Sequence, residues 1–319
     1  MASLNRQNNS TCRPAMGLQR PTKTHKGKRM NEQITKKAPV MTGNATGTER
    51  AKTNQGSDAP TAVLIGATGG LGNALARLLT AEGFRIVLAA RREQDAAVLT
   101  GRSDGSAIYL RADVTDPASL EKLAAAAFDH LGRIDAVVNL AGISPRKPIE
   151  DYTTADVDAL MAINVKGPIF VTQAFLPRLL KQPGGGVVVH LGGAMDGRVA
   201  LPFMSAYAAT RGALASYVQG ANRELEGTNV ALSFFGPAPS NTESESPFFD
   251  MWKKMGVDLC EPDEVARDIL ATIRQRRREH VMGGALLKMM TLMNAISPSA
   301  ADAIGLRKFG KLIKQYSPR

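Results

Sequence analysis

The stretch "APTAVLIGATGGLGNALARLLTAEGFRIVLAARRE", residues 59–93, decides the fold. Its apolar run at 63–65 ends in glycines, and leucines then recur at helical spacing from Leu71 to Leu79. A second apolar run, 85–90, closes a unit of about thirty residues, the length that a parallel strand–helix–strand crossover needs. The stretch therefore predicts a strand, a tight turn, a helix and a second strand parallel to the first.

The rest of the chain repeats this alternation of strand and helix. Asp116 and Pro117 are a natural N-cap and first residue for one of the helices. The strands are apolar on both faces, which favours a parallel sheet covered by helices on each side. We predict an α/β fold, a doubly wound Rossmann-like sheet in a single domain over residues 60–284. Further strands are expected at 106–114, 135–142, 184–193, 229–236 and 280–284, and further helices at 116–131, 153–180, 205–225 and 261–277.

The net charge of +11 is concentrated near the N-terminus, because residues 1–57 hold eleven Lys and Arg against Glu32 and Glu49. This segment has no hydrophobic period and is rich in Asn, Thr, Gln and Gly, so we expect a disordered basic extension. No aromatic residue precedes Phe84, so nothing there could stack on bases, and no nucleic-acid partner is expected.

We expect a cytoplasmic protein. The alternative is an organelle location, if the Arg-rich extension is a transit peptide. A further alternative for the extension itself is that the true start of the chain is Met16, Met30 or Met41. No window of about 18 consecutive apolar residues appears, so no spanning helix is expected. The two cysteines have no spacing typical of a multi-thiol metal site, and no metal is expected.

The glycines of "IGATGGLG" are Gly66, Gly70 and Gly72, at a strand-to-helix turn. Glycine lets the backbone approach a pyrophosphate closely, and the helix N-terminus stabilises its charge. In this context the spacing predicts a dinucleotide site; the alternative is a glycine-rich turn that binds nothing.

The end of the second strand bears on the choice of cofactor. An NAD site usually has an acidic residue there for the ribose 2′-OH, whereas Arg accommodates a 2′-phosphate. This chain has Ala90 followed by Arg91 and Arg92, which favours NADP, unless both arginines are ordinary solvated residues.

Five further motifs make the chain resemble the short-chain dehydrogenase/reductase family over about residues 60–284. They are "ADV" around Asp113, "NLAG" from Asn139 to Gly142, "INV" around Asn164, "SAYAATRGAL" around Tyr207, and "GPAPSNT" ending at Thr242. They occur in the family's order and at its spacings, which makes the resemblance specific.

The resemblance implies a role for each matching position. Tyr207 would be the general acid, Arg211 would stand in for the family's lysine, and Asn164 would hold a water in a proton relay. Asp113 would contact the adenine, and Asn139 would support the central strand. The implied cofactor-binding set is Gly66, Thr68, Gly70, Leu71, Gly72, Arg91, Arg92, Asp113, Val114, Asn139, Ala141, Gly142, Tyr207, Arg211, Pro237 and Thr242. The alternative is that Asn139, Asn164 and Tyr207 are ordinary buried, hydrogen-bonded residues.

Two departures from the family affect the implied chemistry. Arg211 replaces a lysine, and Gly193 or Ala194 stands where the family has a serine. A phenol needs roughly 4 kcal/mol to bring its pKa from about 10 toward 7. A cation about 4 Å away supplies about that much at an effective dielectric near 20. Arginine can therefore replace the charge, but its planar fork replaces the geometry poorly.

The missing serine is the larger loss, because one preorganised oxyanion donor is worth about 10² to 10³ in rate. Candidate substitutes are His190, Ser205 and Thr210, although His190 lies on a core strand and could equally be a packed, hydrogen-bonded histidine.

The segment 242–256 contains Phe248, Phe249, Met251, Trp252 and Met255. In the family the corresponding stretch folds over the substrate, and such a lid would suit a small apolar carbonyl or alcohol; the alternative is a loop helix packed on the core.

Residues 285–319 are expected to form an amphipathic helical tail, with Leu306, Phe309, Leu312 and Ile313 beside basic residues. Its apolar face is expected to pack on the protein or on a neighbouring subunit, and the alternative is an anionic membrane surface. The resemblance also suggests a homodimer or homotetramer.

The sequence as a whole predicts an NADP(H)-dependent carbonyl reductase or alcohol dehydrogenase with an atypical active site. The alternative function is a non-catalytic NADP-binding scaffold or sensor.

Overall fold

A computed structural model of the chain describes residues 58–91, 107–193, 199–283 and 285–316. The expected disordered extension at 1–57, together with Arg92 and Ala194, lies outside the described residues. Apart from Asp58, all described residues belong to one compact unit.

Seven parallel strands form one sheet in the order β3-β2-β1-β4-β5-β6-β7. The predicted doubly wound fold is therefore confirmed. The order reverses between β1 and β4, and in such sheets ligands bind at this point, beyond the carboxyl ends of the strands. The strands are β1 Thr61–Ile65, β2 Arg85–Ala90, β3 Ala107–Arg111, β4 Ala136–Asn139, β5 Gly186–Leu191, β6 Val230–Gly236 and β7 Glu279–Val281.

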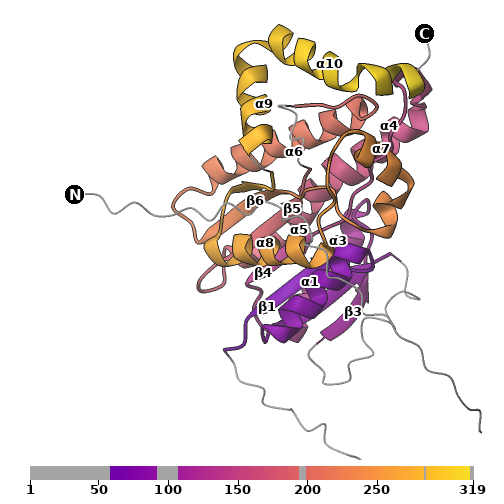
Figure 1. Cartoon of the computed structure of the whole chain (residues 1–319). Coiled ribbons are helices and arrows are strands. Elements are labelled where there is room, and N and C mark those ends of the chain that lie inside the picture. Colours follow the sequence, from indigo (N-terminus) through magenta and orange to yellow (C-terminus); the bar gives the residue numbers. More distant parts are fainter. Residues whose placement is uncertain (1–57, 92–106, 194–198, 284, 317–319) are drawn as a thin grey trace, which may run out of the picture. The chain divides into compact units, whose positions relative to one another are not determined.

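Helices cover both faces of the sheet (Figure 1). They are α1 Gly70–Ala81, α3 Pro117–Leu131, α4 Thr154–Met161, α5 Gly167–Leu179, α6 Ser205–Glu224, α7 Phe249–Lys254, α8 Pro262–Gln275, α9 Ala285–Ile296 and α10 Pro298–Tyr316, with short helical turns at η2 Ile149–Asp151, η3 Ala162–Lys166 and η4 Glu243–Phe248. As predicted, Asp116 caps α3 by accepting from the backbone N–H of Ala118.

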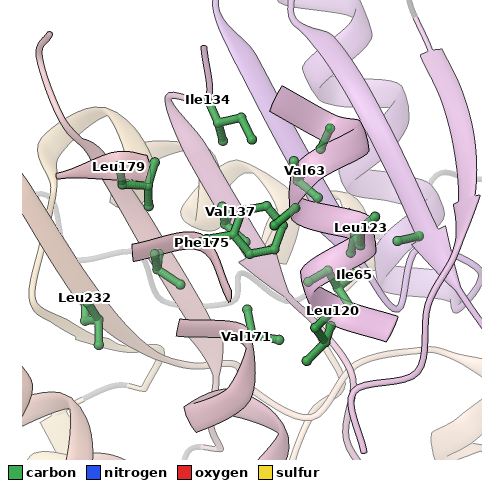
Figure 2. Packing of buried hydrophobic residues seen from close by; sticks show 14 of the residues in the cluster. Val63, Ile65, Leu120, Leu123, Ile134, Val137, Val171, Phe175, Leu179 and Leu232 are labelled. Carbon is green, nitrogen blue, oxygen red and sulfur yellow. The ribbon is translucent and has the colours of Figure 1, made fainter. Parts of the chain in front are cut away.

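Alternate residues of each strand enter two separate cores because side chains of a strand point to opposite faces. Val63 and Ile65 of β1 join α3 and α5 on one face, and Figure 2 shows them beside Leu120, Leu123 and Phe175. Ala62 and Leu64 face α1 and α8 on the other side. Burial on both faces explains why the strands lack polar alternation.

The expected long helix at 153–180 is interrupted by η3, a π-helical turn that joins α4 to α5. The stretch Thr154–Leu179 is also long and apolar enough, with a mean hydropathy of 1.4, to be a candidate membrane span, which the sequence interpretation did not anticipate. Its Val171, Phe175 and Leu179 have no exposed surface, because they pack in the core with α3 and the sheet (Figure 2). Core packing therefore accounts for the apolar residues on this face of α5.

Candidate active site

A cavity of about 1180 Å³ lies at the carboxyl ends of the central strands. Its lining includes the turn after β1, the loop after β4, the start of α6 and the segment after β6. Parallel strands bring their carboxyl ends to one edge of a sheet, so motifs from distant parts of the sequence meet here.

The glycine turn after β1 has the form of a phosphate cradle. Gly66 has φ +80°, and a Cβ added to it would lie 2.9 Å from the backbone nitrogen of Ala141. A Cβ on Gly72 would lie 2.5 Å from the carbonyl oxygen of Ala67, so α1 can pack against the turn only without a side chain there. Gly69, the N-cap of α1, has no side chain to occupy the helix N-terminus, and a Cβ there would meet nothing within 4 Å. This open helix N-terminus at the cavity wall suits a pyrophosphate.

The residues expected to surround the adenosine half also line the cavity. Ala90 ends β2 and Arg91 follows it with an exposed side chain. The Asp113 carboxylate accepts from the backbone N–H and the hydroxyl of Thr115, at 2.9 and 2.8 Å, which fixes its orientation. No acidic side chain follows β2 at residues 90 and 91.

Tyr207 and Arg211 stand one turn apart on α6, and both line the cavity. The guanidinium carbon of Arg211 lies 4.9 Å from the centroid of the Tyr207 ring. Tyr207 is 8% exposed and Arg211 only 3%. The two side chains that the sequence paired are therefore adjacent, and the ring is on the cavity side of the helix.

Arg211 is a buried cation with little compensation from the protein. Its Nη1 donates to the Leu191 carbonyl at 3.1 Å, while Nε has no partner. No salt bridge to a carboxylate in the described part of the chain is seen for it. A buried charge is costly unless it is paired or hydrogen-bonded, so this site favours negative charge or oxygen acceptors in the cavity.

Gly142 makes the room that this guanidinium occupies. A Cβ on Gly142 would lie 2.8 Å from Nη2 of Arg211 and 3.4 Å from Oδ1 of Asn164. The glycine of "NLAG" therefore serves the position of α6 as well as the end of β4.

Asn164, in η3, joins the loop after β4 to α6. Its amide donates to the Ile143 carbonyl at 2.8 Å and to the Thr210 hydroxyl at 3.2 Å, and its oxygen accepts from the Ile143 N–H at 3.0 Å. Both N–H groups of the amide are thus used within the protein. The side chain is fully buried and does not line the cavity. The structure places it as a positioning residue, and the water-holding role stays a prediction.

Asn139 is likewise buried, at the end of β4. Its Oδ1 accepts from the Ala141 N–H at 3.1 Å, whereas its Nδ2 has no partner. It supports the loop that leads to Gly142 and does not itself line the cavity.

Gly193 stands against the phenol, where the family's serine was expected. A Cβ built on Gly193 would lie 2.6 Å from the Tyr207 hydroxyl oxygen. That hydroxyl makes only a long, 3.5 Å contact to the Gly192 carbonyl. No side chain at 193 can therefore donate to a substrate oxygen beside Tyr207.

None of the three expected substitutes for this serine lines the cavity. Thr210 donates to the Tyr207 carbonyl at 2.7 Å and accepts from Asn164, so its hydroxyl is engaged inside the helix layer. Ser205 is exposed at the start of α6. His190 is fully buried, and burial lowers its pKa to about 3. These positions do not support His190, Ser205 or Thr210 as a substitute for the serine, and a substitute on the substrate itself stays a prediction.

One wall of the cavity is formed by a segment after β6, and the contacts that hold this segment in place are seen only in the structure. Arg146, from the loop after β4, forms an ion pair with Glu245 of η4 at 2.8 Å. Its guanidinium carbon lies 3.8 Å from the Phe248 ring centroid and 5.0 Å from the Trp252 ring. The Trp252 indole N–H donates to the same Glu245 carboxylate at 2.8 Å. Residues 243–254, which we call the lid, are thus fastened to the cavity wall by one arginine.

Two features of this region were not found from the sequence. The Arg146 side chain is 4% exposed, and its Nε and Nη1 have no partner in the protein. The hydroxyl of Ser144, two residues earlier, is also buried and unpartnered, and the residue lines the cavity. The sequence carries no short motif for either; only their place just after "NLAG" could have drawn attention to them.

The lid region and α10 share one apolar cluster. Tyr207, Met251, Trp252 and Met255 pack with Phe309 of α10. Phe309, with Met290 of α9, also lines the cavity. The 242–256 segment therefore packs on the body and also lines the cavity, and its role over a substrate stays a prediction.

Most of the expected cofactor set is brought together at this one cavity. The exceptions are Asn139, which supports the cavity from behind, and Arg92, which lies outside the described residues. The residues that line it are Gly66, Thr68, Gly70, Leu71, Gly72, Arg91, Asp113, Val114, Ala141, Gly142, Tyr207, Arg211, Pro237 and Thr242.

Comparison with known proteins identifies the family. Residues 60–252 match the family model for short chain dehydrogenases. An uncharacterized oxidoreductase of Staphylococcus epidermidis is 34% identical over 195 residues, which cover 61% of this chain and 84% of that protein. The chain belongs to the short chain dehydrogenase family of oxidoreductases.

Solved structures show the same fold. A short chain dehydrogenase/reductase from Burkholderia phymatum, in complex with NAD, has a TM-score of 0.68 at 22% identity and covers 76% of this chain and 95% of its own. An actinorhodin polyketide ketoreductase with NADPH has a TM-score of 0.64 at 21% identity, covering 71% and 96%. Proteins with a similar fold thus bind NAD in one case and NADPH in the other.

Proposed function

We propose that the protein is an NADP(H)-dependent reductase of small apolar carbonyl compounds, or a dehydrogenase of the corresponding alcohols. The observation that carries this proposal is the pairing of Tyr207 with the Arg211 cation at the wall of a cavity that also contains the glycine cradle. Family membership supports the reaction class.

The choice of NADP rests on Arg91. Its exposed side chain follows β2 beside the cavity, and Ala90 leaves no carboxylate to bind a ribose 2′-OH there. A guanidinium favours a 2′-phosphate at this position.

The bound nicotinamide supplies hydride to the carbonyl carbon, or accepts it in the reverse direction. Tyr207 gives the proton from its hydroxyl to the carbonyl oxygen, so that an alcohol forms. Arg211 stabilises the phenolate that remains, and its guanidinium, at the cavity wall, would hold a ribose hydroxyl of the cofactor. Trp252 of the lid lines the same cavity, and its apolar surface would limit the access of water to the reacting groups.

The apolar character of the substrate is inferred from the side chains around the lid. Met204, Trp252, Met255 and Phe309 line the cavity near Tyr207 and are nearly buried. Such a lining suits a substrate whose body is hydrocarbon or aromatic.

A second function is favoured by Gly193. Because residue 193 has no hydroxyl, this position supplies no preorganised donor to the developing oxyanion in the described structure. The corresponding protein would bind NADPH through the same cavity and act as a scaffold or sensor without turnover.

Two measurements separate these functions. NADPH fluorescence measures binding, and loss of NADPH absorbance across a panel of apolar ketones and aldehydes measures turnover. Binding without oxidation of NADPH by any carbonyl supports the scaffold and overturns the reductase.

Tyr207→Phe tests the assigned chemistry. Turnover should fall about 10² to 10⁴-fold, the usual worth of a general acid, while NADPH affinity stays within a few fold. Tyr217→Phe is a matched control on the same helix outside the cavity and should leave both unchanged. Unaltered turnover in Tyr207→Phe would show that another group transfers the proton.

A further inference from the structure

Helices α9 and α10 leave a large apolar surface uncovered. The exposed side chains are Met289 (54%), Leu292 (61%), Ile296 (75%), Ile304 (48%) and Leu306 (61%), which we call the α9–α10 patch. Five of the nine large apolar side chains exposed in the described structure are in these two helices, so the exposure is concentrated there and not scattered. Concentrated apolar surface marks an interaction site.

The patch belongs to a pair of helices that other side chains hold to the body. Met289, Leu292 and Ile296 are spaced so that they share one face of α9. Met290 of α9 and Phe309 of α10 line the large cavity instead. Figure 1 shows α9 and α10 as consecutive helices joined by a sharp turn. One side is therefore used in packing, and the other has nothing over it in the described structure.

The charge around the patch decides which partner fits. Arg307, Lys311 and Lys314 are exposed on α10. Between residues 285 and 316 the sequence has five basic residues and a single acidic one, Asp302. In a two-fold dimer the same patch would face itself and bring like charges together. An anionic lipid surface instead takes both the apolar side chains and the cations.

We propose that the α9–α10 patch binds the surface of an anionic membrane, with α9 and α10 lying in the plane of the interface. The apolar side chains enter the boundary between headgroups and acyl chains, and the three cations contact lipid phosphates. Nothing in this arrangement requires a helix to cross the bilayer.

Two neighbouring cavities would connect the membrane-bound patch with Tyr207. A second cavity of about 300 Å³ is lined by Ile304 and Leu306 of the patch, among others. It shares Val199, Leu201, Met290 and Phe309 with the large cavity. An apolar carbonyl dissolved in the membrane could therefore reach Tyr207 from beneath the patch. This last step rests on the proposed reductase function, whereas membrane binding does not.

The test is co-sedimentation of the full chain with vesicles of phosphatidylcholine containing about 30% phosphatidylserine, and with phosphatidylcholine alone. The double variant Leu292→Asp/Ile296→Asp should reduce partitioning to the anionic vesicles by about tenfold or more. The matched control, Val157→Asp/Met161→Asp, changes two exposed apolar residues of α4 and should leave it unaltered. The basic segment 1–57 is present in every protein compared, so its attraction to lipid cancels.

Lys311→Glu/Lys314→Glu tests the electrostatic part. This variant should lose the part of the preference for anionic vesicles that comes from the patch. Its partitioning should therefore fall more on vesicles with phosphatidylserine than on vesicles of phosphatidylcholine alone. Retained NADPH binding shows that the variants are folded.

Equal partitioning of the Leu292→Asp/Ile296→Asp variant and the unmodified chain overturns the proposal. The proposal is also overturned if this variant binds vesicles normally but has a lower molecular mass in analytical ultracentrifugation than the unmodified chain. That result would show that the patch binds a second copy of the chain. Neither result depends on turnover, so they are distinct from failure of the reductase function.

Discussion

Two glycines decide where the side chains of Tyr207 and Arg211 can lie. Gly193 leaves space for the Tyr207 hydroxyl, and Gly142 leaves space for the Arg211 guanidinium. At both positions the important property is the absence of a Cβ atom. A Cβ at either one would approach a nitrogen or oxygen more closely than packing allows.

Gly142→Ala should displace the guanidinium of Arg211, because the new methyl group would lie 2.8 Å from Nη2. We expect turnover to fall at least about tenfold, since misplacement of about 1 Å can cost 10²-fold. Steady-state kinetics with NADPH and the best carbonyl of the panel measure the change. Gly220→Ala, in the same helix as Arg211 and with nothing within 4 Å of the added Cβ, is the control and should be neutral or slightly stabilising. Normal turnover in Gly142→Ala would mean that the guanidinium position is unimportant.

The sequence identified Tyr207 and Arg211 because four-residue spacing on a helix puts both on one face. It could not identify Arg146 or Ser144 in the same way. Arg146 meets Glu245, Phe248 and Trp252 only after the loop beyond β4 and the segment beyond β6 come together in the fold. Contacts between residues about a hundred positions apart leave no local pattern.

At the scale of elements, the lid is held to the loop after β4 through the side chain of Arg146. Glu245, Phe248 and Trp252 all lie in residues 243–254, and all contact Arg146 or its partner carboxylate. A nearly buried ion pair is costly to break from one side, because the remaining charge is left without a partner. The lid should therefore open when the arginine is removed.

Trp252 is the single tryptophan of the chain, so its fluorescence reports on the lid alone. Arg146→Ala should shift Trp252 emission to longer wavelength and increase its quenching by iodide, since the buried indole becomes solvated. Arg178→Ala is the control: it removes a cation 5.7 Å from the Phe128 ring, away from the lid, and should leave Trp252 emission unchanged. An unshifted spectrum in Arg146→Ala would contradict the fastening role.

The succession of strands and helices followed closely from the sequence, within a residue or two at many ends. Apolar runs and Gly-rich turns are local signals, and the β1–α1–β2 unit has both. The π-helical turn at Ala162–Lys166 was missed, because a helical pattern of apolar residues does not reveal where the hydrogen bonding changes. Asn164 lies within this turn and donates to the Ile143 carbonyl and the Thr210 hydroxyl.

For the whole molecule, His190 links folding to pH. Thr172 gives its hydroxyl proton to the Pro168 carbonyl, so His190 Nε2 must donate to Thr172, which leaves Nδ1 unprotonated and without a partner. Protonation would add a charge in a site without exposure. Burial therefore lowers the pKa of His190 from 6.5 to about 3.

Between pH 6.5 and about 3 the unfolded chain carries a proton on this histidine that the folded chain does not. The free energy of unfolding should thus fall on acidification below pH 6.5, by up to about 1.4 kcal/mol per pH unit from this residue, and the effect is absent above that range. Urea unfolding at pH 7.5 and 5.5 measures it. His190→Gln should be less stable at pH 7.5 but lose less stability between the two values; equal losses would show that His190 is not the group responsible.

The position of Phe309 in the Tyr207 cluster has a consequence for how the protein matures during synthesis. The glycine turn, Tyr207 and Arg211 are synthesised about a hundred residues or more before Phe309. Until α10 has been synthesised, the part of the cavity wall that Phe309 forms is missing. A nascent chain halted before residue 309 would have a complete sheet but an incomplete cavity beside Tyr207, so ligand binding at this cavity should require the synthesis of α10.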